Sequence, residues 1–87
     1  EYALEAAYPN PFNPSTTVYV GLPEAADLTV GVYNVLGQQV AVLASDRMNA
    51  GRHALTFDAH GLASGLYFIR ATVPGHLSQV QKVMLVR

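Results

Sequence analysis

The chain has 87 residues, of which 51% are apolar and 13% charged, and its formal net charge is −1. This length allows one small domain or one module of a longer protein, and such an apolar composition excludes a disordered tail. The chain has no basic surplus for a nucleic-acid backbone, no cysteine for a disulfide or a thiolate site, and no apolar run near the roughly 20 residues of a transmembrane helix.

The N-terminal residues predict a linker or a short first strand, followed by an unusual proline-rich segment. Residues 1–7 are compatible with either a linker or a strand near 2–7. Residues 8–14 read YPNPFNP, and each residue before a proline is driven to extended geometry. We expect this segment to be a structural motif in which Tyr8 and Phe12 cover the open end of a sandwich, while the prolines block an exposed strand edge. The motif consists of Pro9, Asn10, Pro11, Phe12, Asn13 and Pro14.

From residue 15 onward, apolar residues recur at every second position, which is typical of strands. The expected strands lie near 16–22, 27–34, 38–44, 52–58, 65–73 and 77–87. Pro23 ends the first of them, and the turn signals NVLG and VPGH separate later ones. The run 65–73 is almost continuously apolar, so we expect a central strand that is buried on both faces. Six or seven short strands with regular turns predict an all-β fold, an antiparallel immunoglobulin-like β-sandwich that occupies residues 8–87 as a single domain.

Charge is distributed unevenly along the sequence. Residues 1–46 hold five acids and no Lys or Arg, whereas residues 47–87 hold five Lys or Arg and a single acid. One interpretation is that a compact fold interleaves the two halves and cancels the field. The other is that a cationic surface near the C-terminus attracts an acidic partner.

No residue set points to catalysis or to a metal site. His53, Asp58 and His60 are the best metal candidates, but a site needs three or four converging ligands. Ser64 lies outside any nucleophile elbow, and no phosphate-binding loop or oriented pair of acids is apparent. We therefore expect no catalytic residue, no cofactor and no metal.

Carbohydrate binding is an alternative that the tyrosines leave open. Tyr19 and Tyr33 are out of phase with the apolar residues of their strands, so both are expected to face outward. Outward tyrosines also serve cross-strand packing, and the chain has no Trp. The alternative function is thus a structural or carbohydrate-binding accessory module of a secreted multidomain enzyme.

The last predicted strand reaches residue 87. Such a strand completes the sandwich, and its tip is expected to be accessible. We expect Lys82, Arg87 and the terminal carboxylate to form a signal for a partner, and addition of a strand to the edge is one way to bind it.

Five short blocks occur in a fixed order along the chain, at residues 8–14, 22–23, 32–37, 62–67 and 82–87. In this order and spacing they resemble the type A C-terminal sorting domain of proteins exported by the bacterial type IX secretion system. That family is related in sequence to the immunoglobulin-like domain of flagellar hook-capping proteins. The chain departs from the usual pattern at Asn34, where Asp is usual, at Gln38, where Arg is usual, and at Arg87, where Lys is common.

The resemblance implies a non-enzymatic C-terminal secretion signal. It implies that attached cargo passes through the type IX system to the cell surface or the medium. The implied partners are the secretion machinery, a surface processing peptidase and an upstream cargo domain in the same parent chain. By resemblance, the partner-recognition residues are Gly65, Leu66, Tyr67, Lys82, Val83, Leu85 and Arg87, and Tyr33 and Gly37 belong to the structural motif.

Overall fold

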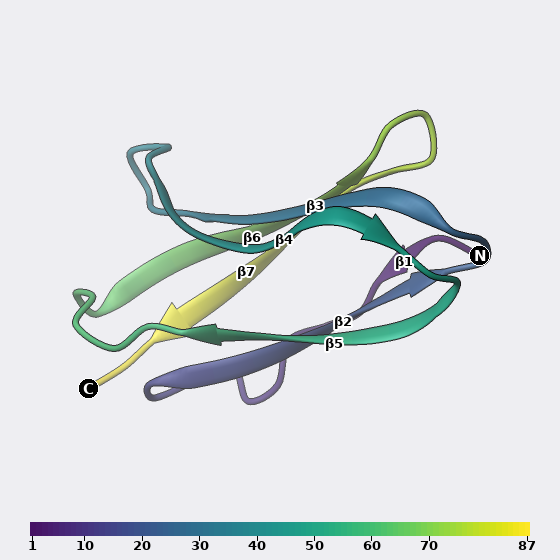
Figure 1. The fold of residues 1–87 in the computed structure, drawn as a ribbon. Helices are drawn as coiled ribbons and strands as arrows, with labels where there is room; N and C mark the ends of the chain where they lie inside the picture. The colour runs from purple at the N-terminus through teal and green to yellow at the C-terminus, as the bar shows by residue number, and fades with distance from the viewer.

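The computed structural model describes residues 1–87 and shows two antiparallel sheets packed face to face (Figure 1). The three-stranded sheet has the order β1 (Ala3–Leu4), β2 (Ser15–Leu22), β5 (Gly51–Asp58). The four-stranded sheet has the order β4 (Gln39–Met48), β3 (Ala26–Tyr33), β6 (Gly65–Val73), β7 (Leu77–Leu85). This arrangement confirms the predicted all-β sandwich, whose two layers are those of immunoglobulin-like domains. The chain forms no helix that is long and apolar enough to cross a membrane.

The core is a single cluster of 19 buried residues between the two sheets. Strand β2 shows how the sequence builds it, because every second residue from Thr16 to Leu22 is buried and the residues between them face outward. Thr16 is the one polar residue in this buried set, and its hydroxyl donates a hydrogen bond of 2.7 Å to the carbonyl of Pro9. The alternation of two therefore specifies both the strands and the face that each strand buries.

Strand β4 differs most from its predicted bounds, since it continues to Met48 rather than ending near residue 44. Ser45, Asp46 and Arg47 near its end are polar, and none of its ten residues is fully buried. Register shifts between Val30 and Gly31 and between Val32 and Tyr33 of the neighbouring strand place two irregularities along the β3–β4 ladder. Irregularities of this kind twist an edge strand and discourage another strand from pairing with it.

Strand β6 is central in its sheet but is buried on one face only. Its inward residues Tyr67, Ile69, Ala71 and Val73 are buried. Its outward residues Leu66 and Arg70 are exposed. The prediction that this strand is buried on both faces is wrong, because no other layer covers the outer face of the four-stranded sheet (Figure 1).

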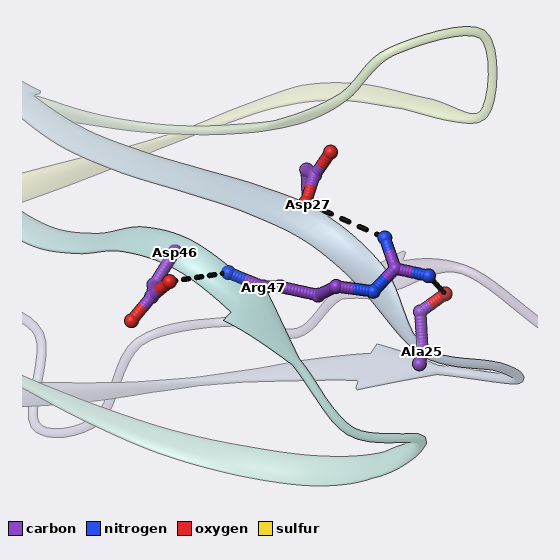
Figure 2. A network of polar contacts seen from close by, with 4 residues as sticks. All are labelled: Ala25, Asp27, Asp46 and Arg47. Carbon is purple, nitrogen blue, oxygen red and sulfur yellow. Dashed lines mark hydrogen bonds and ion pairs between the residues drawn. The ribbon is translucent and has the colours of Figure 1, made fainter.

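One ion pair links the acidic first half of the chain to the basic second half across the β3–β4 ladder (Figure 2). The Arg47 Nη1 atom lies 3.5 Å from Asp27 Oδ1, and Nη2 donates a hydrogen bond of 3.5 Å to the carbonyl of Ala25. The backbone N–H of Arg47 donates to Asp46 Oδ1 at 2.8 Å. Both partners of the ion pair are well exposed, so it contributes little to stability.

A second ion pair ties the N-terminal segment to the three-stranded sheet. Arg52 donates through Nε and Nη2 to the two carboxylate oxygens of Glu5, at 3.0 and 2.9 Å, and its guanidinium also lies 3.7 Å from the centroid of the Tyr19 ring. The hydrogen bond from Arg52 holds the pKa of Glu5 below its ordinary value. The first interpretation of the charge pattern is therefore right for these two pairs, and attraction of an acidic partner stays a prediction. Two pairs cancel across the halves, while Arg70, Lys82 and Arg87 have no carboxylate partner.

A candidate interaction surface beside the C-terminal strand

The proline-rich segment runs along the outer edge of β7, and Asn10 provides the first contact. Its Nδ2 donates to the carbonyl of Lys82 at 2.9 Å, and its Oδ1 accepts the backbone N–H of Met84 at 3.0 Å. One side-chain amide thus takes the place that a neighbouring strand's peptide group would occupy.

The backbone of Phe12 continues this contact. Its N–H donates to the carbonyl of Met84 at 2.8 Å, and its carbonyl accepts the N–H of Val86 at 3.0 Å. The Phe12 ring is 2% exposed and lies 5.6 Å from the ring of Phe57 in the core. The edge of β7 is therefore closed near its C-terminal end. The expectation of an accessible tip that accepts an added strand is wrong there, because residues of the proline-rich segment already hold the outward-facing backbone groups.

Tyr8 does not cover the end of the sandwich, contrary to the prediction. Its backbone forms an antiparallel bridge with Thr17, with both N–H···O distances at 3.0 Å. Paired residues of an antiparallel bridge place their side chains on the same face, and Thr17 faces outward. Tyr8 is consequently 81% exposed, and of the two aromatic residues only Phe12 is buried in the core.

The block at residues 65–67 contains two residues that support the fold and one that is exposed on the surface. Gly65 begins β6 with a φ of +145°, which side-chain-bearing residues rarely adopt. Tyr67 is buried with its ring edge-on to Phe57 at 5.8 Å, and its hydroxyl donates to the carbonyl of Ala63 at 2.6 Å. Leu66 is thus the one member of this block whose side chain is exposed on the outer face of the sheet.

The C-terminal block divides in the same way. Val83 and Leu85 are buried in the core, whereas Lys82 is exposed. The guanidinium of Arg87 folds back and donates through Nη2 to the carbonyls of Ala59, at 3.4 Å, and Leu62. In the folded domain, Lys82 is therefore the cation of this block that is exposed and holds no hydrogen bond through its side chain.

Asn34 organises the turn between β3 and β4. Its Oδ1 accepts the N–H groups of Leu36 and Gln38 at 2.9 and 3.0 Å, and the N–H of Gly37 donates to its carbonyl at 3.0 Å. Its Nδ2 donates to Oε1 of Gln38 at 2.8 Å. Asn34 and Gln38, the two residues of this turn that differ from the family pattern, are thus in direct contact. The held turn presents Val35 and Leu36, which are 68% and 78% exposed.

Tyr33 lies along the outer face of the four-stranded sheet over Gly31. A Cβ atom at Gly31 would lie 3.1 Å from the Tyr33 hydroxyl oxygen, so a larger residue there would push the ring away. The hydroxyl donates to Oε1 of Gln39 at 3.1 Å. The glycine therefore allows an aromatic ring to lie flat on the sheet.

Two shallow hollows lie on either side of this turn. The larger, of about 460 Å³, is lined by Tyr33, Asn34, Val35, Gly37, Phe68, Arg70 and Val80. The smaller, of about 290 Å³, is lined by Asn34, Val35, Leu36, Ala63, Ser64, Gly65, Leu66 and Tyr67. We name the larger hollow and its neighbour Lys82, which pairs with Phe68 across the β6–β7 ladder, the outer-sheet patch. Its side chains are Tyr33, Val35, Phe68, Arg70, Val80 and Lys82.

None of the sequence blocks or candidate sites includes Phe68, Arg70 or Val80. The signal that could have found them is their phase, since Phe68 and Arg70 alternate with the inward residues of β6. The expectation of two-sided burial hid this signal.

The metal candidates do not converge. His53 Nε2 lies 2.7 Å from the carbonyl of Asn49, and Asp58 Oδ1 accepts the backbone N–H of His60 at 3.0 Å. No group of three or more His, Cys, Asp or Glu side chains is placed to hold a metal ion.

The two tyrosines considered for sugar binding lie on different sheets. Tyr19 is on β2 and has one face covered by Arg52, whereas Tyr33 is on β3 and lies over Gly31. They cannot form one stacking platform, so nothing in the geometry favours the carbohydrate-binding alternative.

Comparison with known proteins identifies the family. A family model described as a secretion system C-terminal sorting domain matches residues 6–86. The chain belongs to this family. It is a C-terminal sorting signal of the type IX secretion system, which exports proteins across the outer membrane to the cell surface or the medium. No protein with a curated description matches the chain significantly.

Proposed function

We propose that this domain is a folded, non-enzymatic module that directs an upstream cargo of the same parent chain through the type IX machinery. The observation that supports it is spatial. Four of the five sequence blocks that carry the family resemblance are far apart in the chain but meet at one end of the sandwich, whereas Leu22 and Pro23 lie at the other end. Asn10 and Phe12 of the first block bind residues 82–86 of the last, and the turn at 34–37 shares a hollow with Gly65 and Leu66.

This convergence favours recognition of a folded body over recognition of a linear tail. Much of the C-terminal block serves the fold, because Val83 and Leu85 are in the core and Arg87 binds the loop before β6. The machinery would then contact the side chains that this scaffold leaves outside, namely Leu66, Lys82 and the residues of the turn.

The test is export of a reporter fused upstream of Glu1 in a bacterium that has the type IX system. We expect the reporter at the cell surface or in the medium only when the domain is attached. Retention of the reporter inside cells that make the soluble, folded fusion would contradict the proposal, and so would equal export of the reporter alone.

Deleting residues 82–87 is a poor second step, because it removes Val83 and Leu85 from the core as well as the surface cations. Sharper variants are Lys82→Ala and Arg87→Ala, each checked for folding by circular dichroism. A domain that folds but no longer exports its reporter would separate recognition from stability.

Removal of the domain by a surface peptidase is the other half of the proposal. From Leu4 onward the chain is held in the fold, since Leu4 is buried and pairs with Val20. We expect cleavage upstream of β1, which mass spectrometry of the reporter's new C-terminus would locate. A cut between residues 8 and 87 in the folded domain would contradict it.

A further inference from the structure

We propose that the outer-sheet patch is a docking surface for a partner polypeptide that presents carboxylates beside aliphatic or aromatic side chains. This inference deepens the proposed function and rests on it, since the partner would belong to the export route. It assigns recognition to Phe68, Arg70 and Val80, which the family blocks do not include.

The first argument is apolar exposure. Val35 and Val80 are 68% and 52% exposed, and with the half-buried Tyr33 and Phe68 they line a continuous hollow of about 460 Å³. A contiguous apolar patch beside polar groups on a small soluble domain marks a contact surface. A purely polar ligand would not need these apolar side chains, so the partner carries apolar side chains as well.

The second argument is charge. Arg70 pairs with Val80 across the β6–β7 ladder and Lys82 pairs with Phe68, so both cations stand on the face that carries the apolar side chains. Neither cation has a carboxylate partner in the domain, and no Asp or Glu lines the hollow. The complementary surface therefore carries negative charge.

The third argument is rigidity. Asn34 holds the turn that carries Val35 through hydrogen bonds to Leu36 and Gln38, and Gly31 lets the Tyr33 ring lie flat. The carbonyl of Lys82 is fixed by Asn10. A surface held in place before contact loses little conformational freedom on binding.

Two other occupants fit less well. A second copy of this chain, docked through the same patch about a two-fold axis, would bring the cations of both copies together without an acid between them. A strand added to β7 is disfavoured because Asn10 and Phe12 already hold the edge between residues 82 and 86.

The cellular test compares two double variants in the reporter fusion. Arg70→Glu with Lys82→Glu reverses the charge, whereas Arg70→Lys with Lys82→Arg conserves it. We expect the reversal to lower export at least about tenfold and the conserving swap to retain it. The urea midpoint of unfolding of both purified double variants should be close to that of the original domain, because Arg70 and Lys82 are exposed. Wild-type export of the charge-reversed fusion, in a host where removal of the domain abolishes export, would overturn this inference and leave the proposed function intact.

A second test does not depend on export. The 15N-labelled domain is titrated with a probe peptide of alternating Asp and Phe, and with a matched peptide of alternating Lys and Phe. We expect amide shifts at Tyr33, Phe68 and Val80 with the acidic peptide, reduced at least about fivefold with the basic one. An equal response to both peptides, or shifts confined to the three-stranded sheet, would overturn the inference. Self-association of the original domain in analytical ultracentrifugation that the charge reversal weakens would do so as well, because the patch would then serve a second copy.

Discussion

The edge and the outer face of strand β7 differ in their exposure, because another segment of the domain covers the edge and nothing covers the face. Along the edge, Asn10 and Phe12 bind the outward backbone groups between residues 82 and 86. On the outer face, Val80 and Lys82 remain exposed beside Phe68 and Arg70. The backbone groups at the edge of β7 between residues 82 and 86 are thus bound within the domain, whereas the side chains on its outer face remain free to contact a partner.

This difference determines whether a partner can recognise β7 through its backbone or through its side chains. Backbone N–H and C=O groups pair with any other strand, so an open edge invites indiscriminate association. Side chains differ from protein to protein and can select a partner by shape and charge. Closing the edge while leaving the face open therefore suits a domain that is recognised specifically.

The largest effect should come from removing the ring that anchors the closing segment. Phe12→Ala leaves a cavity beside Phe57, and we expect it to lower the free energy of unfolding by about 3–5 kcal/mol. Tyr8→Ala is the matched control in the same segment, and at 81% exposure it should change stability by less than about 0.5 kcal/mol. Urea denaturation measures both, and similar losses for the two variants would contradict the assigned roles.

A smaller effect should follow from opening the edge alone. Asn10→Ala removes the hydrogen bonds to the carbonyl of Lys82 and the N–H of Met84, and we expect a loss of about 1–2 kcal/mol in the same denaturation assay. Asn13→Ala changes the same residue type at an exposed position nearby and serves as the control. If Asn13→Ala costs as much as Asn10→Ala, the specific contact with β7 is not what stabilises the segment.

The turn that borders the outer face allows a subtler test. Asn34→Asp alone or Gln38→Arg alone places one charge in a contact that now joins two amides. The double variant creates an opposite-charge pair, and we expect a favourable coupling of about 0.2–1 kcal/mol in a double-mutant cycle. A coupling of zero would mean that the two departures from the family pattern are independent.

The weakest effect concerns Glu5, which ties the N-terminal segment to β5 of the three-stranded sheet. Its folded-state pKa is lowered by the hydrogen bond from Arg52, so the pair stabilises the fold above the unfolded pKa and loses that contribution as the pH falls through the folded one. We expect Glu5→Gln to be slightly less stable than the original domain at neutral pH, with the gap closing in acid. A gap that widens as the pH falls would contradict the assigned ion pair.

Much of the sandwich follows from the sequence because alternation is local. The run 65–73 was placed at the observed bounds of β6, and Pro23 follows directly after β2 ends at Leu22. The same run misled the prediction of burial, since its nearly continuous apolar character also suits a strand with one face open. The predicted strand 38–44 ends before β4 does, because polar residues such as Asp46 follow the apolar part of the strand.

The closing of the β7 edge was beyond prediction from local patterns. It depends on Asn10 meeting backbone groups of Lys82 and Met84, more than 70 positions away, through a side chain that imitates a peptide group. The family blocks, for their part, do not separate residues that support the fold from residues on the surface. Val83 and Lys82 are adjacent in one block, yet one is in the core and the other is exposed.

Amide hydrogen exchange on the intact domain tests the central claim most directly, because it reports on the edge of β7 residue by residue. The N–H groups of Met84 and Val86 are bound by Asn10 and Phe12. The N–H of Val80 points the same way by the alternation of an antiparallel ladder, and no such partner holds it. We predict slow exchange at Met84 and Val86 and fast exchange at Val80. Exchange at Met84 and Val86 as fast as at Val80 would show that the edge is open and would contradict the account.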